Sequence, residues 1–340
     1  MSPYSHSLTS LRPLCVTSIF LNSNDISSPL SLPGSHRHMP VVLLGLLFLT
    51  GVLGCQPQNE ASPAQTKRAV VEVVATDSSL QTTSSVPSGW ITFRMRNEGA
   101  THHSFKMRKL PPGKTIADIE RGLYDPADSL EALLVEGRID SATYGREMGQ
   151  RVPAWFPEET TVVGGITGLA PGRTAQITQN LPPGHYALSC LFQTPEGHTH
   201  ALLGVRSGLT VTEDSSGAQP PEADVTARLS HTSFDVDTAA LSDEQTVAFR
   251  SEGGPNGNGS PFVGLFRLTR ETDAAKVVSW MEEGIPLPAP TEWIGGPEPM
   301  PDGNVAYVDV GALPAGRYAW IAETAPDTTG MVKPFIVREE

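Results

Sequence analysis

Aromatic and charged residues are scarce in this sequence, at 6% and 18% of its 340 residues, whereas glycine (32) and proline (30) are abundant. This composition disfavours long helices, because glycine and proline are the poorest helix formers, and it favours β-rich domains with many turns. The length corresponds to about two domains of roughly 150 residues each. We therefore expect an all-β protein with more than one domain.

Basic residues are outnumbered by acidic ones. The 24 Lys and Arg residues against 37 Asp and Glu residues give a formal net charge of −13. Arg12, Arg37 and Asp25 are the charged residues that precede position 55, so the rest of the chain has 22 basic and 36 acidic residues and a net charge of −14. A surface this acidic repels nucleic acids and anionic lipids. We expect no nucleic acid partner and no membrane contact through the protein surface.

Motifs for common enzyme chemistries are also missing. Residues 253–260, GGPNGNGS, are rich in glycine, but no Lys-Ser or Lys-Thr pair follows them as a phosphate-binding loop requires. The acidic residues are dispersed, without a motif for paired carboxylate catalysis. We expect no catalytic residues and no enzymatic activity.

No hydrophobic run is long enough to cross a bilayer as a helix. The longest run, at 41–53, has 13 residues, whereas a membrane span needs about 20. Its length is typical of the apolar core of a signal peptide. The run ends in Val-Leu-Gly-Cys at Cys55 and resembles the bacterial lipobox, whose cysteine is lipidated and becomes the new N-terminus. The alternative is a buried helix that is followed by a cysteine by chance.

The lipobox resemblance implies an exported protein in the cell envelope, held to a membrane by a lipid on Cys55 and facing the periplasm or the exterior. Residues 1–54 are then the leader and signal peptide, with Met39 as an alternative start. Residues 55–68 form a polar tether. The lipid is the membrane contact that we expect.

Three cysteines are present, at positions 15, 55 and 190. Cys15 falls in the leader and Cys55 carries the lipid, so Cys190 remains as one free thiol in a compartment that favours oxidation. Such a thiol is expected to be buried or bound to a metal ion.

Two stretches of related sequence follow the tether. Residues 69–212 and 224–340 are separated by a linker at 213–223 that is rich in Ser, Gly and Pro. Four pairs of segments match in the same order: 97–110 and 251–268, 162–165 and 293–296, 181–190 and 313–322, and 204–211 and 330–337. This pattern indicates a tandem duplication of one domain. Each copy is long enough to bury its own core, and we expect two structurally independent domains.

Short runs of alternating apolar and polar residues, such as 90–95, predict strands in each copy. A helical insertion interrupts both copies at the same place. In the first copy, Thr115 and Asp118 have the spacing of a capping box, and Asp125 before Pro126 has the pattern of a helix start.

The first copy resembles the cupredoxins, the blue-copper proteins, over nearly all of 69–212. The resemblance is carried by an Asn-Glu-Gly turn at 97–99, a histidine that opens the next strand, a late Tyr-x-x-x-Cys strand, a loop with histidines and a closing strand. It implies two tandem Greek-key β-sandwiches, each with a helical insertion. It also implies a copper ion in the first copy, held by an early His, a late Cys, a second His and often a weak axial Met.

The alternation of side chains along a strand selects among the candidate ligands. His103 shares a face with Phe105 and Met107 and is expected to point inward, and Cys190 likewise shares a face with apolar residues. His102 falls on the opposite, outward face of the same strand as His103.

The loop that follows Cys190 offers His198 and His200. His200 is preferred because Val205 follows it after four intervening residues, which is the spacing of the family's axial methionine. The expected ligands are therefore His103, Cys190 and His200, with His198 and His102 as less favoured candidates. Valine at the axial position cannot ligate, and the loop of nine residues between Cys190 and His200 is longer than is usual in the family.

The second copy lacks these ligands. Pro261 and Ala322 stand at the positions of the first histidine and the cysteine, the histidine loop is deleted, and Met331 takes the axial position. We expect this copy to be free of metal.

A thiolate with two imidazoles in a trigonal site accommodates both Cu(I) and Cu(II), so electron transfer needs little rearrangement. The leading expectation is a mononuclear copper protein that exchanges one electron with a redox partner protein. A copper storage or delivery protein is one alternative. A metal-free binding module is another, since an inward cysteine is often only a small buried hydrophobe.

Overall fold

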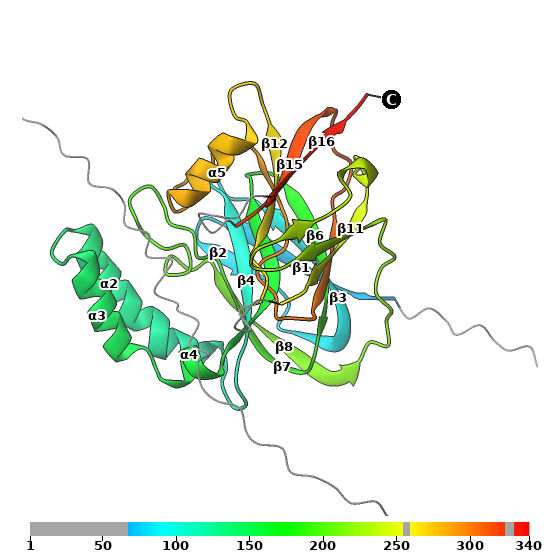
Figure 1. The fold of residues 1–340 in the computed structure, drawn as a ribbon. Coiled ribbons are helices and arrows are strands. Elements are labelled where there is room, and N and C mark those ends of the chain that lie inside the picture. Colours follow the sequence, from blue (N-terminus) through cyan, green and yellow to red (C-terminus); the bar gives the residue numbers. More distant parts are fainter. Residues whose placement is uncertain (1–66, 254–258, 324–329, 340) are drawn as a thin grey trace, which may run out of the picture. The chain divides into compact units, whose positions relative to one another are not determined.

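The computed structural model describes residues 67–253, 259–323 and 330–339 (Figure 1). The expected signal peptide, Cys55 and nearly all of the tether lie outside the described residues. No helix in the described part of the chain is both long and apolar enough to cross a membrane.

The first copy, here called repeat 1, has eight strands and a helical insertion between the fourth and the fifth. Its strands are β1 (Ala69–Thr76), β2 (Ser79–Gln81), β3 (Ser85–Asn97), β4 (His103–Lys109), β5 (Thr161–Leu169), β6 (Thr174–Leu181), β7 (Gly184–Ser189) and β8 (Arg206–Ser215). Its helices are α1 (Ile116–Ile119), the π-helical turn η2 (Glu120–Tyr124), α2 (Asp125–Val135), α3 (Ser141–Arg151) and α4 (Trp155–Glu159).

The second copy, repeat 2, has the same order of elements with a shorter insertion. Its strands are β9 (Val225–Leu229), β10 (Phe234–Asp235), β11 (Thr246–Ser251), β12 (Val263–Leu268), β13 (Trp293–Gly295), β14 (Val305–Asp309), β15 (Gly316–Ala322) and β16 (Val332–Val337). Its helices are the 3₁₀ turn η3 (Thr238–Ala240) and α5 (Ala274–Glu282).

Both repeats are β-sandwiches with equivalent strand orders. In repeat 1 one sheet has the order β2–β1–β3–β6 and the other the order β8–β7–β4–β5. The corresponding sheets of repeat 2 are β10–β9–β11–β14 and β16–β15–β12–β13. The all-β fold and the tandem arrangement predicted from the sequence are confirmed. The limits of the two domains in the sequence stay a prediction.

Strand β3 takes part in both sheets of repeat 1. Its first residues pair with β8, and the part from Gly89 onward pairs with β6. Gly89 has a φ of +107°, and a Cβ atom there would lie 2.9 Å from Oγ of Ser216. Glycine is therefore needed where the strand passes from one sheet to the other.

Equivalent hydrogen bonds recur in the two repeats. The hydroxyl of Tyr186 donates to the carbonyl of Pro182 at 2.6 Å, and that of Tyr318 donates to the carbonyl of Pro314 at 2.7 Å. These residues occupy matched positions in the aligned segments 181–190 and 313–322. The duplication seen in the sequence therefore extends to the details of the fold.

The repeats join through equivalent strands. β6 pairs with β14 and β5 with β13, each pair antiparallel. The amide of Thr167 donates to the carbonyl of Gly296 at 2.9 Å, and the amide of Glu298 donates to that of Gly165 at 3.1 Å. Because Gly165 matches Gly296 and Thr167 matches Glu298, the two bonds are reciprocal. The junction thus has the pattern of a twofold axis, as in a symmetric dimer.

The repeats are not independent in the way that we expected from the sequence. Ile177 of β6 faces Val308 of β14 across the junction, and both belong to one buried cluster that continues through the two sandwiches. Arg173 of repeat 1 also forms an ion pair with Glu292 of repeat 2. Each repeat therefore completes part of its core against the other.

The insertion of repeat 1 starts as predicted but differs from the prediction in the middle. Asp118 accepts hydrogen bonds from the backbone amide and the hydroxyl of Thr115, at 2.9 and 3.0 Å. Asp125 does not start a new helix, because Tyr124 and Asp125 are themselves helical and η2 runs directly into α2. The wide π turn just before Pro126 accommodates the proline ring, which an ideal α-helix would exclude.

Candidate metal centre

The candidate metal centre lies where β4 begins and β7 ends. The two strands pair antiparallel, with Lys106 opposite Ser189, so the first residue of β4 and the residue after β7 come close together. These residues are His103 and Cys190. The pairing of the two strands therefore brings together ligands that are far apart in the sequence.

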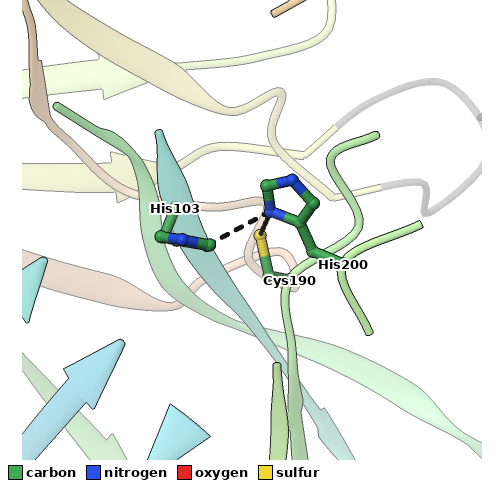
Figure 2. Close-up of side chains that lie close together, drawn as sticks. All are labelled: His103, Cys190 and His200. Atoms are coloured by element: carbon green, nitrogen blue, oxygen red, sulfur yellow. Dashed lines mark hydrogen bonds between the residues drawn. The ribbon is translucent and has the colours of Figure 1, made fainter. Parts of the chain in front are cut away.

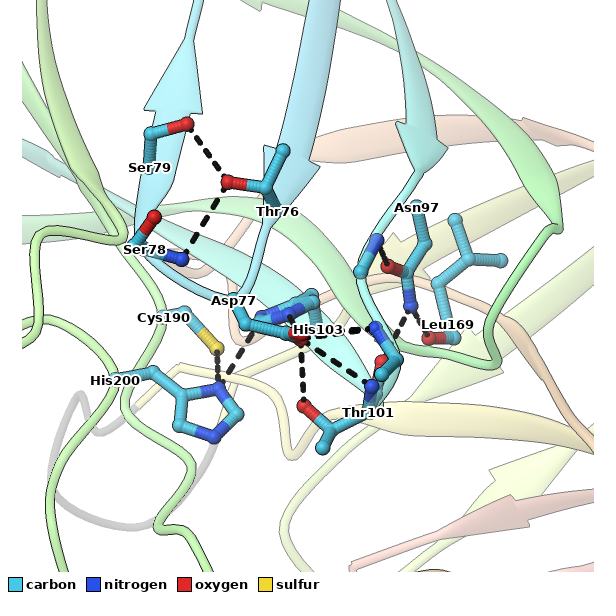
Figure 3. A network of polar contacts seen from close by, with 12 residues as sticks. Thr76, Asp77, Ser78, Ser79, Asn97, Thr101, His103, Leu169, Cys190 and His200 are labelled. Atoms are coloured by element: carbon cyan, nitrogen blue, oxygen red, sulfur yellow. Dashed lines mark hydrogen bonds and ion pairs between the residues drawn. The ribbon is translucent and has the colours of Figure 1, made fainter.

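The turn before His103 is held by the side chain of Asn97 (Figure 3). Nδ2 of Asn97 donates to the carbonyls of Thr101 and Leu169, each at 2.8 Å, and its Oδ1 accepts from the amide of Gly99 at 2.9 Å. The buried amide side chain uses both its donor and its acceptor groups, as a buried polar group must. The start of β4 is therefore fixed by a network inside the fold.

Asp77, in the turn between β1 and β2, contacts His103 directly. Its Oδ1 lies 3.0 Å from Nε2 of His103, and its carboxylate also accepts from the amides of Ala100 and Thr101 and from the hydroxyl of Thr101 (Figure 3). The role of Asp77 has no signal in the sequence, because nothing in the local pattern around position 77 links it to a histidine 26 residues later.

Gly99 leaves room for this contact. A Cβ atom at Gly99 would lie 2.5 Å from Oδ1 of Asp77 and 2.6 Å from Nε2 of His103. Both distances are shorter than any side chain tolerates. The glycine of the Asn-Glu-Gly turn is therefore required by the contact between Asp77 and His103.

Cys190 is completely buried, and its sulfur accepts hydrogen bonds. The amide of Ser104 lies 3.4 Å and its hydroxyl 3.6 Å from Sγ. Burial raises the pKa of the Cys190 thiol, although the amides of Phe192 and Ser104 act in the opposite direction. The free thiol is therefore protonated at neutral pH, and N–H groups are already placed to stabilise a thiolate once a metal ion displaces the proton.

His200 is brought to Cys190 by backbone hydrogen bonds within the loop. The amide of Cys190 donates to the carbonyl of Val205 at 3.0 Å, and the amide of Val205 donates to that of His200 at 2.9 Å. The amide of His200 donates to the carbonyl of Phe192, and that of Ala201 to the carbonyl of Cys190, both at 2.8 Å. The long loop is therefore closed upon itself, with both of its candidate ligands at its base.

The side chains of His103, Cys190 and His200 converge on one point (Figure 2). Nδ1 of His200 lies 3.1 Å from Nδ1 of His103 and 3.5 Å from Sγ of Cys190. The three candidate ligand atoms all lie within 4.8 Å of one another, and the residues are 0–2% exposed. Within the described ranges, this is the group of three or more metal-ligating side chains that the fold brings together.

The two histidines are neutral in this setting. Burial lowers the pKa of His103, although Asp77 acts in the opposite direction, and burial together with the nearby His103 lowers the pKa of His200 to about 4. With Nε2–H of His103 donated to Asp77, its Nδ1 holds a lone pair that faces the centre. His103 is therefore held in the tautomer that a metal ion needs.

The donor set fits copper. Two imidazole nitrogens and one thiolate sulfur are the ligand types of trigonal copper sites with a weak or absent axial ligand. A carboxylate on the outer nitrogen of a ligating histidine is also the usual partner in metal sites, because it orients the ring. The His–Cys–His group can therefore hold a copper ion.

His102 is buried, which the alternation of side chains did not indicate. We expected it on the outward face with Ser104, but the two residues are only 8% and 3% exposed. The outward face at the start of β4 is therefore also covered by other parts of the protein. Nε2 of His102 is buried without a hydrogen-bond partner among the described residues.

The remaining two positions are those of His198, the less favoured ligand of the loop, and Val205, at the expected axial position. His198 points away from the group, and its Nδ1 lies 3.7 Å from Oε2 of Glu131 in α2. Val205 is completely buried and is bonded through its backbone to Cys190 and His200, next to both candidate ligands. The assignment of individual ligands stays a prediction.

The corresponding place in repeat 2 has an equivalent backbone hydrogen bond but different side chains. The amide of Ala322 donates to the carbonyl of Met331 at 3.0 Å, which matches the bond between Cys190 and Val205. Val263 faces Ala322 across β12 and β15, so that Pro261 falls at the position of His103. The alignment of the two copies is therefore correct at these positions.

No family model and no curated protein matches the chain. Among solved structures, it is similar to a reduced auracyanin from Roseiflexus castenholzii (19% identity, covering 42% of this chain and 97% of that chain, TM-score 0.23). It is also similar to auracyanin A, a "blue" copper protein from Chloroflexus aurantiacus (17% identity, 43% and 100% covered, TM-score 0.25), and to copper nitrite reductase from Nitrosomonas europaea (10% identity, 81% and 94% covered, TM-score 0.21).

Repeat 1 is a cupredoxin-like domain. The features that mark the domain are its strand order and its His–Cys–His group.

Proposed function

We propose that repeat 1 binds one copper ion through His103, Cys190 and His200 and uses it for one-electron transfer. The observation that carries this proposal is the convergence of one ring nitrogen from each of two histidines and one Sγ atom within 4.8 Å at a buried point. Bound copper would supply a one-electron Cu(I)/Cu(II) couple. We expect the protein to be a carrier that serves a redox partner protein rather than an enzyme.

Contacts from neighbouring residues would hold the candidate ligands in the same positions in both oxidation states of the copper. Asp77 holds the ring of His103, and Ser104 donates to the sulfur of Cys190. These contacts are formed before any metal ion binds, so little reorganisation is needed when the charge of the site changes. Burial keeps both histidines neutral, so that protons compete little with the metal at neutral pH.

We also propose that the protein is exported and anchored to a membrane by a lipid on Cys55. The support comes from the sequence alone: an apolar run of signal-peptide length, the residues Val-Leu-Gly before Cys55, and a polar tether after it. In such a location the carrier would meet its redox partner at the membrane surface.

The decisive test is a visible spectrum of the protein without its leader after addition of one equivalent of Cu(II). We expect an intense thiolate-to-copper absorption band that disappears reversibly on reduction. Cys190→Ser should abolish the band because it arises from sulfur, and His200→Ala should weaken binding. His198→Ala is the matched control in the same loop and should leave the spectrum nearly unchanged.

Other outcomes would favour the other two functions. A protein that retains Cu(I) and transfers it to an acceptor chelator, without reversible cycling, would be a storage or delivery protein. A colourless protein whose Cys190 thiol still reacts after copper loading would overturn the proposal and favour a metal-free binding module.

A further inference from the structure

The loop that carries His200 is held from outside by the helical insertion. Oε2 of Glu131, in α2, accepts from the backbone amide of Thr199 at 3.0 Å, and its Oε1 accepts from the hydroxyl of Thr199 at 2.5 Å. Thr199 immediately precedes His200. One carboxylate therefore binds both donors of the residue next to a proposed ligand.

Glu131 is unusual because it is a buried carboxylate on a helix. It is 4% exposed, whereas glutamate is almost never fully buried unless it is paired. Burying a carboxylate is unfavourable unless hydrogen bonds replace its water, and here the donors come from the loop. Glutamate at this position is therefore poorly suited to helix packing alone and well suited to holding Thr199.

The rest of the loop also packs against the insertion. Ala201 is completely buried in the apolar cluster formed by the insertion helices, and Leu191 and Leu202 pack against the same cluster. Gly197 of the loop lies beside Val135, the last residue of α2. A Cβ atom added to Gly197 would lie 3.6 Å from the side chain of Val135. The insertion thus contacts the loop on both sides of Thr199.

Such an anchor answers a physical need of this loop. A loop of nine residues between two ligands has more conformational freedom than a shorter one, and ordering it opposes metal binding. A fixed residue directly before His200 removes much of that freedom in advance. The copper geometry would then depend on a segment that lies outside the two sheets.

We propose that Glu131 is a positioning residue for His200, and that the insertion of repeat 1 serves to fix the ligand loop through it. This inference rests on the proposed copper function for its consequence. The contact between Glu131 and Thr199 can also be tested without metal, so that failure of one proposal can be told apart from failure of the other.

The variants Glu131→Ala and Glu131→Gln test the role. Glutamine can accept from the amide of Thr199 and donate to its hydroxyl, so it should preserve the contact, whereas alanine removes it. Glu136→Ala is the matched control, because Glu136 caps the same helix, is exposed and pairs only with Arg138 among the contacts seen. Thermal unfolding of each metal-free variant establishes that it is folded.

In the copper-loaded protein, we expect Glu131→Ala to keep a thiolate-to-copper absorption band, but at a changed energy. The copper hyperfine splitting in the electron paramagnetic resonance spectrum should also change. Copper affinity should fall roughly 10-fold to 100-fold, the usual effect of losing an outer contact to a ligand. Glu131→Gln and Glu136→Ala should resemble the wild type. A folded Glu131→Ala protein with unchanged spectra and affinity would overturn the inference.

In the metal-free protein, hydrogen exchange measured on peptides that span 191–203 should be faster in Glu131→Ala than in the wild type, in Glu131→Gln and in Glu136→Ala. Unchanged exchange would overturn the anchoring role, whatever the copper result. If Glu131→Ala does not fold, Thr199→Val replaces it: loss of the hydroxyl contact alone should still increase exchange in the loop, and no increase would count against the inference. Faster exchange in a protein that binds no copper would support the anchor and refute the proposed function.

Discussion

The carboxylate of Asp77 lies 3.0 Å from Nε2 of His103, on the side of the ring that faces away from Cys190 and His200. It joins the turn between β1 and β2 to the first residue of β4. A negative charge at this position increases the electron density that the imidazole offers to a metal ion and stabilises the more highly charged Cu(II).

Replacing Asp77 with Asn should therefore raise the reduction potential of the copper site. The side chain of Asp77 is 52% exposed, so water screens its charge, and we expect a rise smaller than the 59 mV that a tenfold change represents for one electron. A spectroelectrochemical titration measures the change. Asp235→Asn removes an exposed charge from β10 of repeat 2 and should leave the potential unchanged; equal shifts in both variants would contradict a specific role for Asp77.

Val205→Met should lower the reduction potential. The equivalent position in repeat 2 already holds Met331, whose carbonyl accepts the same backbone hydrogen bond, so the backbone here is compatible with methionine. A thioether added at the axial position favours Cu(II). Val205→Leu adds similar volume without sulfur and is the control. If leucine and methionine change the potential equally, the effect is one of packing and not of ligation.

The metal-free protein should lose stability as the pH falls. Burial lowers the pKa of both His102 and His200 to about 4, whereas an unfolded chain has histidine pKa values near 6.5. Between about pH 6.5 and about pH 4 the unfolded state binds more protons than the folded state, so the free energy of unfolding decreases with decreasing pH. Urea unfolding in the presence of a chelator measures it.

His102→Gln removes one of these groups and should reduce the slope of stability against pH over that range. A free energy of unfolding that stays constant from pH 6.5 to pH 4.5 in the wild type would show that these histidines are not buried in the neutral form.

Residues 224–340 expressed alone should bind no copper, because repeat 2 has Pro261 and Ala322 in place of ligands. The fragment should also be less stable than the whole chain and should self-associate, because β13 and β14 lose the partners that complete their sheets. Sedimentation and copper analysis test both points. Stoichiometric tight copper binding by the fragment would contradict the loss of ligands, and a stable monomer would contradict the importance of the junction.

Cys55→Ser should release the protein from membranes or block its processing, because only a cysteine can carry the lipid at that position. Fractionation of cells that express each form measures the distribution. A serine variant that is processed normally and stays bound to the membrane would refute the lipid anchor.

Much of the fold follows from patterns that are local in the sequence. The matching segments 181–190 and 313–322 indicate the duplication, and strand alternation places Phe105, Met107 and Cys190 inside the sandwich, where all three are completely buried. The spacing between His200 and Val205 selects the histidine that the structure brings to Cys190. These inferences need only a neighbouring residue or a second copy for comparison.

The parts that were missed depend on contacts between distant segments. Asp77 reaches His103 and Glu131 reaches Thr199 only after the sheets and the insertion have packed, and neither carboxylate belongs to a recognisable motif. The burial of His102 was not expected, because the alternation of residue types does not show that the outward face at the start of β4 is also covered. The pairing of β5 with β13 also has no local signal, since edge strands and paired strands have similar sequences.

The twofold pattern of the junction bears on how the two copies could diverge. Because each repeat uses the same strands that its counterpart uses, a single ancestral copy would already have possessed a surface complementary to itself and could have formed a homodimer with two identical centres. Once both copies were joined in one chain, mutations could affect one centre without altering the other. Repeat 2 could then lose its ligands while the strands that hold repeat 1 remained under selection.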